Sequence, residues 1–314
     1  MRQRLHKVMQ AMLAIVLFCA MGFAHGQTQI LLVLSDGSGA CSEVAAAMQS
    51  YFATHNSAFD IRTINTSAFS DGRVNFTETD IIVAIGTYAM EQVSVDARVP
   101  VLNILVPRQS YESTRLRAKH DSRQYSAIYL DQPLTRQLQL IKAALPNRDA
   151  VGVLLGPSSQ DRLKPLQQAA REQKVGVSAE QVTTEEDIIP ALKRLFTSAD
   201  VLLALPDPLV FNKHTAQSLL LTSYRAQIPL IAYSKSYVSA GALAAVYSTP
   251  AQIGQQAAEL LMRLMQAKTL TLPPPQYPKY FSVNVNYQVA RSLGLIIESE
   301  AALLEQIKAG TERE

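Results

Sequence analysis

The sequence predicts an α/β protein made of two doubly wound, parallel-sheet arrays, and three observations support that prediction. Short apolar runs such as ILLVL at residues 30–34 are typical of strands buried on both faces, as in a parallel sheet covered by helices. Amphipathic stretches of helical length alternate with these runs, which predicts βαβ units. The chain has 314 residues, enough for about two domains of ordinary size.

Each apolar run predicts a strand, and each stretch with apolar residues at helical spacing, such as Val44, Met48 and Phe52, predicts a helix. Strands are expected at 30–34, 59–64, 81–85, 101–106, 125–130, 151–155, 175–179, 201–205, 230–233, 243–247 and 281–285. Helices are expected at 42–54, 88–94, 134–144, 162–173, 185–198, 215–226 and 251–266.

Two breaks in this alternation divide the chain. The polar stretch 115–123 interrupts the pattern, so the first array is expected to end near Gln124 and the second to begin near Tyr125. Three consecutive prolines at 273–275 cannot continue the preceding helix. Residues 269–275 are therefore expected to cross between the arrays, with a plain surface loop as the alternative.

The first 26 residues are typical of an export signal. Basic residues Arg2, Arg4 and Lys7 precede an apolar run at 12–21, and small residues follow at Ala24 and Gly26. The run is shorter than the roughly 20 residues that span a membrane, which disfavours the alternative of an uncleaved anchor. Residues 1–26 are thus expected to be a signal peptide, cleaved after Gly26.

Composition excludes several classes of function. The basic residues of the export signal carry the whole formal charge of +3, so the rest of the chain has no basic excess and no nucleic-acid partner is expected. After cleavage Cys41 is the single cysteine, which excludes an intramolecular disulfide. His55, His120 and His214 share no metal-ligand spacing, so no metal and no cofactor are expected.

Two turns after first-array strands carry hydroxyl groups at expected helix starts. GSGACS at 37–42 resembles a dinucleotide fingerprint that lacks its third glycine, and we interpret it as a tight turn whose Ser38 hydroxyl faces a crevice; simple turn chemistry is the alternative. Thr87 follows Gly86 in the same way, and it either meets a ligand or caps its helix. Ligands of open α/β sheets collect at the carboxyl ends of strands.

Polar and aromatic residues also follow strands of the second array. Asp207 could bind an ammonium or hydroxyl group of a ligand, or it could cap a helix. Ser234, Tyr247 and Ser248 come at the ends of two further strands, and aromatic side chains with a few polar groups commonly line small-molecule pockets. We expect these four residues, with Ser38 and Thr87, to bind a ligand.

The chain carries no recognisable catalytic motif. A Gly-x-Ser-x-Gly elbow, a Walker loop and a His-Glu-x-x-His helix are all missing from the sequence. Any Ser/His/Asp set drawn from its dispersed residues would be arbitrary. The sequence therefore favours binding over catalysis, and no enzyme activity is expected.

Several segments together resemble a known family. These are LQLIKAALPN at 138–147, VGVLLGPS at 151–158, AGALA at 240–244, GQQAA at 254–258, VN at 283–284 and ARSLGL at 290–295. They resemble ABC-transporter substrate-binding proteins of the tryptophan/tyrosine-binding type. Within the resemblance, Gly86-Thr87, Asp207 and Ser234 match family residues.

The resemblance implies a type I periplasmic-binding-protein fold, with two lobes joined by a three-segment hinge. The N-terminal lobe is then expected to contain residues 27–124 and 236–268, and the C-terminal lobe residues 125–235 and 269–314. The implied function is capture of a small molecule, such as an amino acid, by a periplasmic monomer that serves an inner-membrane ABC permease. The alternative is a periplasmic sensor or partner-binding protein without transport.

Overall fold

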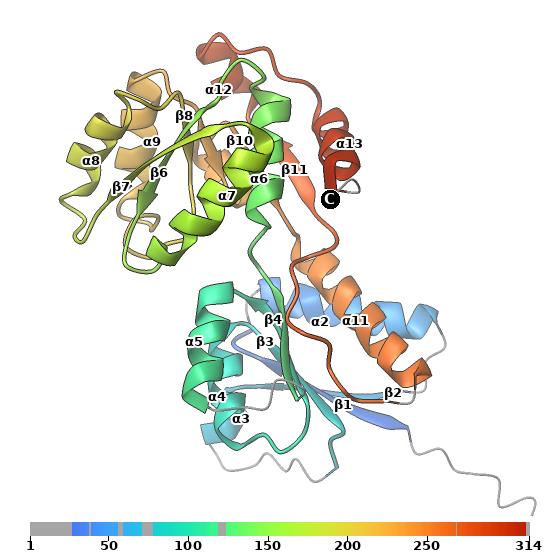
Figure 1. Ribbon diagram of the computed structural model, residues 1–314. Helices are drawn as coiled ribbons and strands as arrows, with labels where there is room; N and C mark the ends of the chain where they lie inside the picture. The colour runs from blue at the N-terminus through green and yellow to red at the C-terminus, as the bar shows by residue number, and fades with distance from the viewer. Residues whose placement is uncertain are drawn as a thin grey trace, which may run out of the picture.

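Two separate sheets organise the chain in the computed structural model, which describes residues 27–37, 39–55, 59–70, 78–118, 124–267 and 269–311 (Figure 1). The first sheet has the order β2-β1-β3-β4-β5 and is parallel throughout. The second has the order β11-β10-β9-β8-β6-β7, and only its edge strand β11 is antiparallel. The predicted α/β fold with two doubly wound lobes is confirmed. The expected signal peptide, residues 1–26, lies outside the described residues.

The first lobe contains the first sheet and the helices that cover it. Its strands are β1 (Thr28–Leu34), β2 (Phe59–Asn65), β3 (Ile81–Ile85), β4 (Val101–Val106) and β5 (Tyr125–Tyr129). Its helices are α2 (Gly39–Thr54), α3 (Ser67–Ser70), α4 (Thr87–Asp96), α5 (Arg108–Ala118) and, much later in the chain, α11 (Pro250–Gln266).

The second lobe contains the second sheet. Its strands are β6 (Ala150–Leu155), β7 (Gly176–Gln181), β8 (Val201–Leu203), β9 (Leu230–Ala232), β10 (Ala244–Tyr247) and β11 (Ser282–Val285). Its helices are α6 (Leu134–Ala144), η1 (Gln160–Arg162), α7 (Leu163–Gln173), α8 (Ile188–Leu195), α9 (Ala216–Arg225), α10 (Lys235–Ala240), α12 (Tyr287–Ser292) and α13 (Glu300–Thr311).

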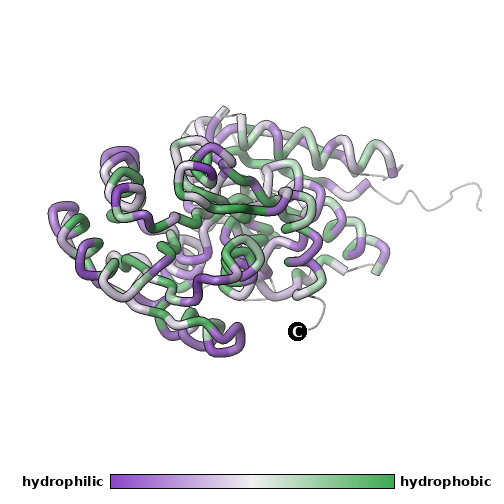
Figure 2. Tube along the Cα trace, turned by 90° about the horizontal axis from the view of Figure 1, so that it is seen from above, coloured by the Kyte–Doolittle hydropathy of each residue, from purple (hydrophilic) through white to green (hydrophobic). Residues whose placement is uncertain are grey.

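The inner strands of each sheet are buried on both faces, which explains why they are continuously apolar. Successive side chains of a strand point to opposite faces, so Leu32 of β1 packs with Met48 of α2 and Ile253 of α11. Leu31 instead packs with Met90 of α4 on the other face. Seen from above, the peripheral helices alternate between hydrophilic and hydrophobic positions, as amphipathic helices do (Figure 2).

The contact between α2 and α11 depends on one glycine. A Cβ atom added at Gly254 would lie 2.6 Å from the carbonyl oxygen of Val44 and 3.0 Å from Cβ of Ala47. The backbone of α2 cannot move away from this contact without separating the two helices. Gly254 therefore permits the close helix packing that returns the chain to the first lobe.

Three crossings connect the lobes, at residues 130–133, 248–249 and 278–281 (Figure 1). Gln132 of the first crossing donates from Nε2 to Oγ of Ser248 in the second at 2.9 Å. Ser248 in turn donates to the carbonyl of Tyr280 in the third at 2.6 Å. Arg136 of α6 donates to Oε1 of Gln132 at 2.6 Å and to the carbonyl of Pro278 at 2.9 Å. One hydrogen-bond network thus joins all three crossings.

The lobe boundaries expected from the sequence are wrong in three places. Strand β5 pairs with β4 in the first sheet, so the chain crosses after Tyr129 and not at residue 125. Elements α10 and β10, expected in the first lobe with residues 236–268, belong to the second, because β10 pairs with β9 and β11. The proline segment, expected as a crossing, runs beside β5 instead: Ser126 donates to the carbonyl of Pro273, and Ile128 pairs with Gln276.

The sequence does not predict helix α5, because its residues RQSYESTRLRA are polar almost throughout. Its buried aromatic side chain is Tyr111, which stacks on Tyr125 with ring centroids 5.4 Å apart. One large aromatic side chain anchors the helix where a row of aliphatic residues would normally do so. Such a helix has no apolar periodicity for sequence analysis to detect.

Replacing Gly254 with Ala tests the α2–α11 contact. Alanine favours a helix by about 1 kcal/mol over glycine, but the forced overlap costs about 1–3 kcal/mol. We therefore expect Gly254→Ala to lower the free energy of unfolding, measured by urea titration. Gly39→Ala at the start of α2, where a Cβ would meet open space, is the matched control and should leave stability unchanged or slightly higher. Equal or greater stability of Gly254→Ala would contradict the packing account.

Candidate functional site

The carboxyl ends of both sheets face the space between the lobes, and two adjoining cavities lie there. The larger, here called the polar cavity, has a volume of about 400 Å³, and the smaller, the aromatic cavity, about 250 Å³. Both are lined by Pro107 and Asp131 from the first-lobe side and by Pro206 and Tyr233 from the second. Cavities of this combined size suit a small molecule.

The first-lobe wall of the polar cavity is the start of α5. A bulge in β4 puts Leu105 in the left-handed region at φ 57°, and the following residues Pro107 and Arg108 line the cavity. The backbone N–H of Arg108 donates to Oδ2 of Asp131 at 2.7 Å, so Asp131 caps the helix. Burial disfavours the charged Arg108 guanidinium and so lowers its pKa. The hydroxyl of Tyr277, 3.1 Å away, and other neighbouring groups raise the pKa by more, so the pKa of Arg108 lies above its ordinary value.

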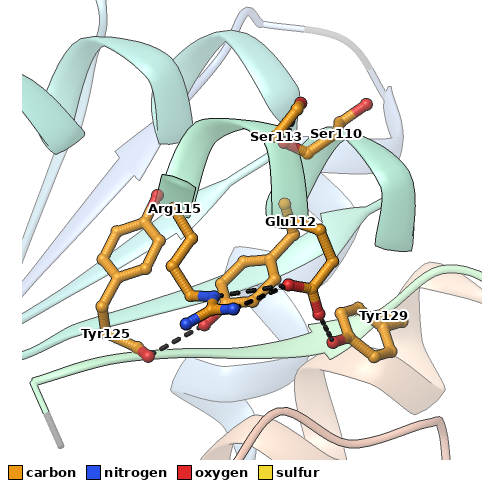
Figure 3. Close-up of polar contacts among 7 residues, drawn as sticks. Ser110, Glu112, Ser113, Arg115, Tyr125 and Tyr129 are labelled. Atoms are coloured by element: carbon orange, nitrogen blue, oxygen red, sulfur yellow. Dashed lines mark hydrogen bonds and ion pairs between the residues drawn. The ribbon is translucent and has the colours of Figure 1, made fainter. Parts of the chain in front are cut away.

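The carboxylate of Glu112 on α5 is already paired with a basic side chain of its own lobe. Glu112 accepts hydrogen bonds from Arg115 at 3.2 and 3.3 Å and from the hydroxyl of Tyr129 at 3.1 Å (Figure 3). Burial and the neighbouring Glu112 raise the pKa of Tyr129, so its hydroxyl remains a donor. Ser110 and Ser113 project from the other side of the helix, and both line the polar cavity (Figure 3).

Asp207 lines the polar cavity, and its carboxylate is fully engaged by its own lobe. It accepts hydrogen bonds from the backbone of Ser158 at 3.1 Å, the hydroxyl of Ser159 at 2.8 Å and the backbone of Leu209 at 2.9 Å. A Cβ at Gly156 would lie 2.5 Å from Oδ1, so this glycine makes room for the carboxylate. The side chain is 2% exposed. This geometry favours the structural alternative for Asp207 over ligand binding.

The other expected site residues divide into two groups. Ser234, Tyr247 and Ser248 line the aromatic cavity, although Ser234 also accepts the Tyr237 N–H as the cap of α10. Thr87 lines neither cavity; the hydroxyl of Ser35 accepts the Ala89 N–H at the start of that helix. Ser38 lies outside the described residues.

Tyr233 and Tyr247 line the aromatic cavity, and Tyr233 contacts two further aromatic rings that are outside its lining. Tyr233 and Tyr237 lie with ring centroids 5.3 Å apart, and Phe211 meets Tyr233 edge-on at 6.2 Å. Burial raises the pKa of Tyr233, and Tyr237 and Asp207 raise it further, so the phenol is neutral at physiological pH. This lining can pack against an apolar or aromatic part of a ligand.

Sequence analysis missed Gln137, which also lines the aromatic cavity. Its side chain is 2% exposed, and its Oε1 has no hydrogen-bond partner among the described residues. A buried amide oxygen without a partner is costly, so this atom is suited to a donor group on a ligand. The sequence does contain one indication of this position. Gln137 is three residues after Leu134 and four before Ile141, so it is a polar residue on the apolar face of α6.

Among the described residues, no group of three or more His, Cys, Asp and Glu side chains is arranged to hold a metal ion. Within the same residues, no helix has the length and apolar character needed to cross a membrane.

Replacing Asp207 with Ala tests its role. The change leaves several buried donors without an acceptor, so we expect the free energy of unfolding to fall by about 2–4 kcal/mol, measured by denaturant titration. Asp161→Ala, at an exposed position lining the same cavity, is the control and should change stability by less than about 0.5 kcal/mol. Unchanged stability with a loss of ligand affinity would instead support the ligand role for Asp207.

Comparison with known proteins agrees with this architecture. Residues 126–308, more than half of the chain, match the family described as ABC transporter substrate binding protein. No curated protein matches the sequence.

Solved structures share the fold. A ligand-free, open substrate-binding protein with adhesive properties from Clostridium difficile has a TM-score of 0.68 at 18% identity, covering 87% of this chain and 96% of that one. An ABC domain in complex with L-Trp from Streptococcus pneumoniae has a TM-score of 0.60 at 16% identity, covering 90% and 98%. A conserved domain protein from Vibrio cholerae has a TM-score of 0.59 at 18% identity, covering 89% and 98%. With the family match over residues 126–308, the chain belongs to the ABC transporter substrate-binding proteins.

Proposed function

We propose that the protein captures a small solute between its lobes and delivers it to an ABC permease in the inner membrane. The observation that carries this proposal is the pair of interlobe cavities with the buried, unpartnered amide oxygen of Gln137 in the wall. The basic-apolar-small pattern of residues 1–26 supports export to the periplasm, where such a receptor works.

The polar groups that line the cleft favour a solute receptor over a sensor that no longer binds a solute. A protein that had lost solute binding would be expected to fill the cleft with its own apolar side chains. Here the aromatic cavity keeps polar groups, among them Ser234 and Gln137, next to Tyr233 and Tyr247. An aromatic wall with a few polar groups supports a solute with an apolar body, of which an aromatic amino acid or a related compound is one example.

The proposal is tested by native mass spectrometry of the protein purified, without unfolding, from the periplasm of its own cells. We expect one small molecule per chain, released when the protein is denatured. A chain that is consistently free of solute, and whose melting temperature no compound from the same cells raises, would contradict solute capture.

One substitution connects the released solute with the aromatic cavity. Gln137→Leu removes a buried amide without changing volume greatly, so the protein should remain folded while affinity for the released solute falls about tenfold. Titration calorimetry measures the affinity, and Gln167→Leu on the exposed side of α7 is the matched control. Equal affinity of the two variants would place the solute outside the aromatic cavity.

A further inference from the structure

Arg162 has a largely enclosed side chain between the lobes. It ends η1, directly before α7, and lines the polar cavity. Its side chain is 12% exposed, and it donates no hydrogen bond to any residue of the described chain. Its Nε is fully enclosed and has no partner there. A guanidinium has five N–H donors, so Arg162, which lines the cavity, has unused donor capacity.

The nearest opposite charge does not satisfy Arg162. Oδ1 of Asp131 lies 3.9 Å from Nη1, which is an ion pair but too long for a hydrogen bond. The other oxygen of Asp131 accepts the first N–H of α5. Asp131 is thus held by the first-lobe helix, and it offsets the charge of Arg162 without occupying its donors.

The remaining charged groups in the polar cavity are not available to Arg162 either. Glu112 is paired with Arg115, and Asp207 is saturated by donors of its own lobe. Arg108 donates to Tyr277. Asp161 is next to Arg162 in sequence but is exposed. Among the enclosed charged side chains of this cavity, Arg162 is therefore the one whose hydrogen-bonding capacity is least used.

Arginine binds a carboxylate through two parallel N–H···O bonds, and enclosure from water strengthens such a pair. Resting on the proposed function, we infer that the solute is a carboxylic acid whose carboxylate is bound by Arg162 in the polar cavity. Its apolar body lies towards the adjoining aromatic cavity, against Tyr233, which lines both. Asp131 competes with the solute for the same guanidinium.

The test uses titration calorimetry with a set of aromatic and branched aliphatic monocarboxylic acids, each paired with its own neutral primary amide. An acid and its amide have nearly the same shape, so their difference in affinity reports on the charge. We expect the wild-type protein to bind at least one acid about 30-fold or more tightly than its amide.

Two variants should change that preference in opposite directions. Arg162→Gln should abolish the preference for the acid. Arg162→Lys keeps the charge but loses the planar pair of N–H donors, so it should retain only part of the wild-type preference. Asp131→Asn can still accept the Arg108 N–H but removes the competing charge, so the acid should bind more tightly. Arg171→Gln, at an exposed position on α7, is the control and should leave the preference unchanged.

Three results would overturn the inference: no acid of the set binds, an acid and its amide bind equally, or the preference persists in Arg162→Gln. The proposed function has a separate outcome. If the protein purified from its own cells carries a neutral or purely cationic solute, solute capture stands and the carboxylate inference fails. If it carries none and no cell compound stabilises it, solute capture itself fails.

Discussion

The fold depends on a buried hydrogen-bond network that ties the three crossings between the lobes. Arg136 is at its centre, 6% exposed, with its guanidinium 4.0 Å from the ring centroid of Phe281. Burial lowers the pKa of Arg136 to about 10, which still leaves it charged at neutral pH. Because Gln132 and Ser248 complete the network, one crossing cannot change its conformation without breaking bonds to the other two. The lobes are thus expected to move about one shared hinge.

The hinge and the two interlobe cavities share residues. Gln132 and Ser248 hold the crossings together and also line the aromatic cavity. Asp131 on the first crossing caps α5 and pairs with Arg162 in the lining of the polar cavity. A solute that contacts these groups changes the balance of interactions at the hinge itself. The position of the site therefore supplies a physical route from binding to a change in lobe orientation, since a ligand shifts a conformational equilibrium only through different contacts in the two states.

Much of this architecture could be predicted from the sequence, because strands buried on both faces must be apolar and short helices between them must be amphipathic. Ser234, Tyr247 and Ser248 could be proposed from their places after strands. Lobe membership could not, since β5 and β10 look alike in sequence and only pairing assigns each to a sheet. Helix α5 could not be predicted either, because its sequence is too polar to show apolar residues at helical spacing. Arg162 and Gln137 stand out because their polar groups lack partners, which is a property of three-dimensional surroundings and not of residue type.

The central claim, that the lobes close on a solute held between them, is tested most directly by the distance between spin labels on the two lobes. Arg117→Cys on α5 and Lys213→Cys before α9 place labels at exposed positions, and Cys41 is buried and so protected from labelling. Double electron–electron resonance then compares the protein that retains its natural solute with the same protein stripped of it. We predict a shorter and narrower distance distribution with solute bound. Identical distributions in the two samples would contradict the account.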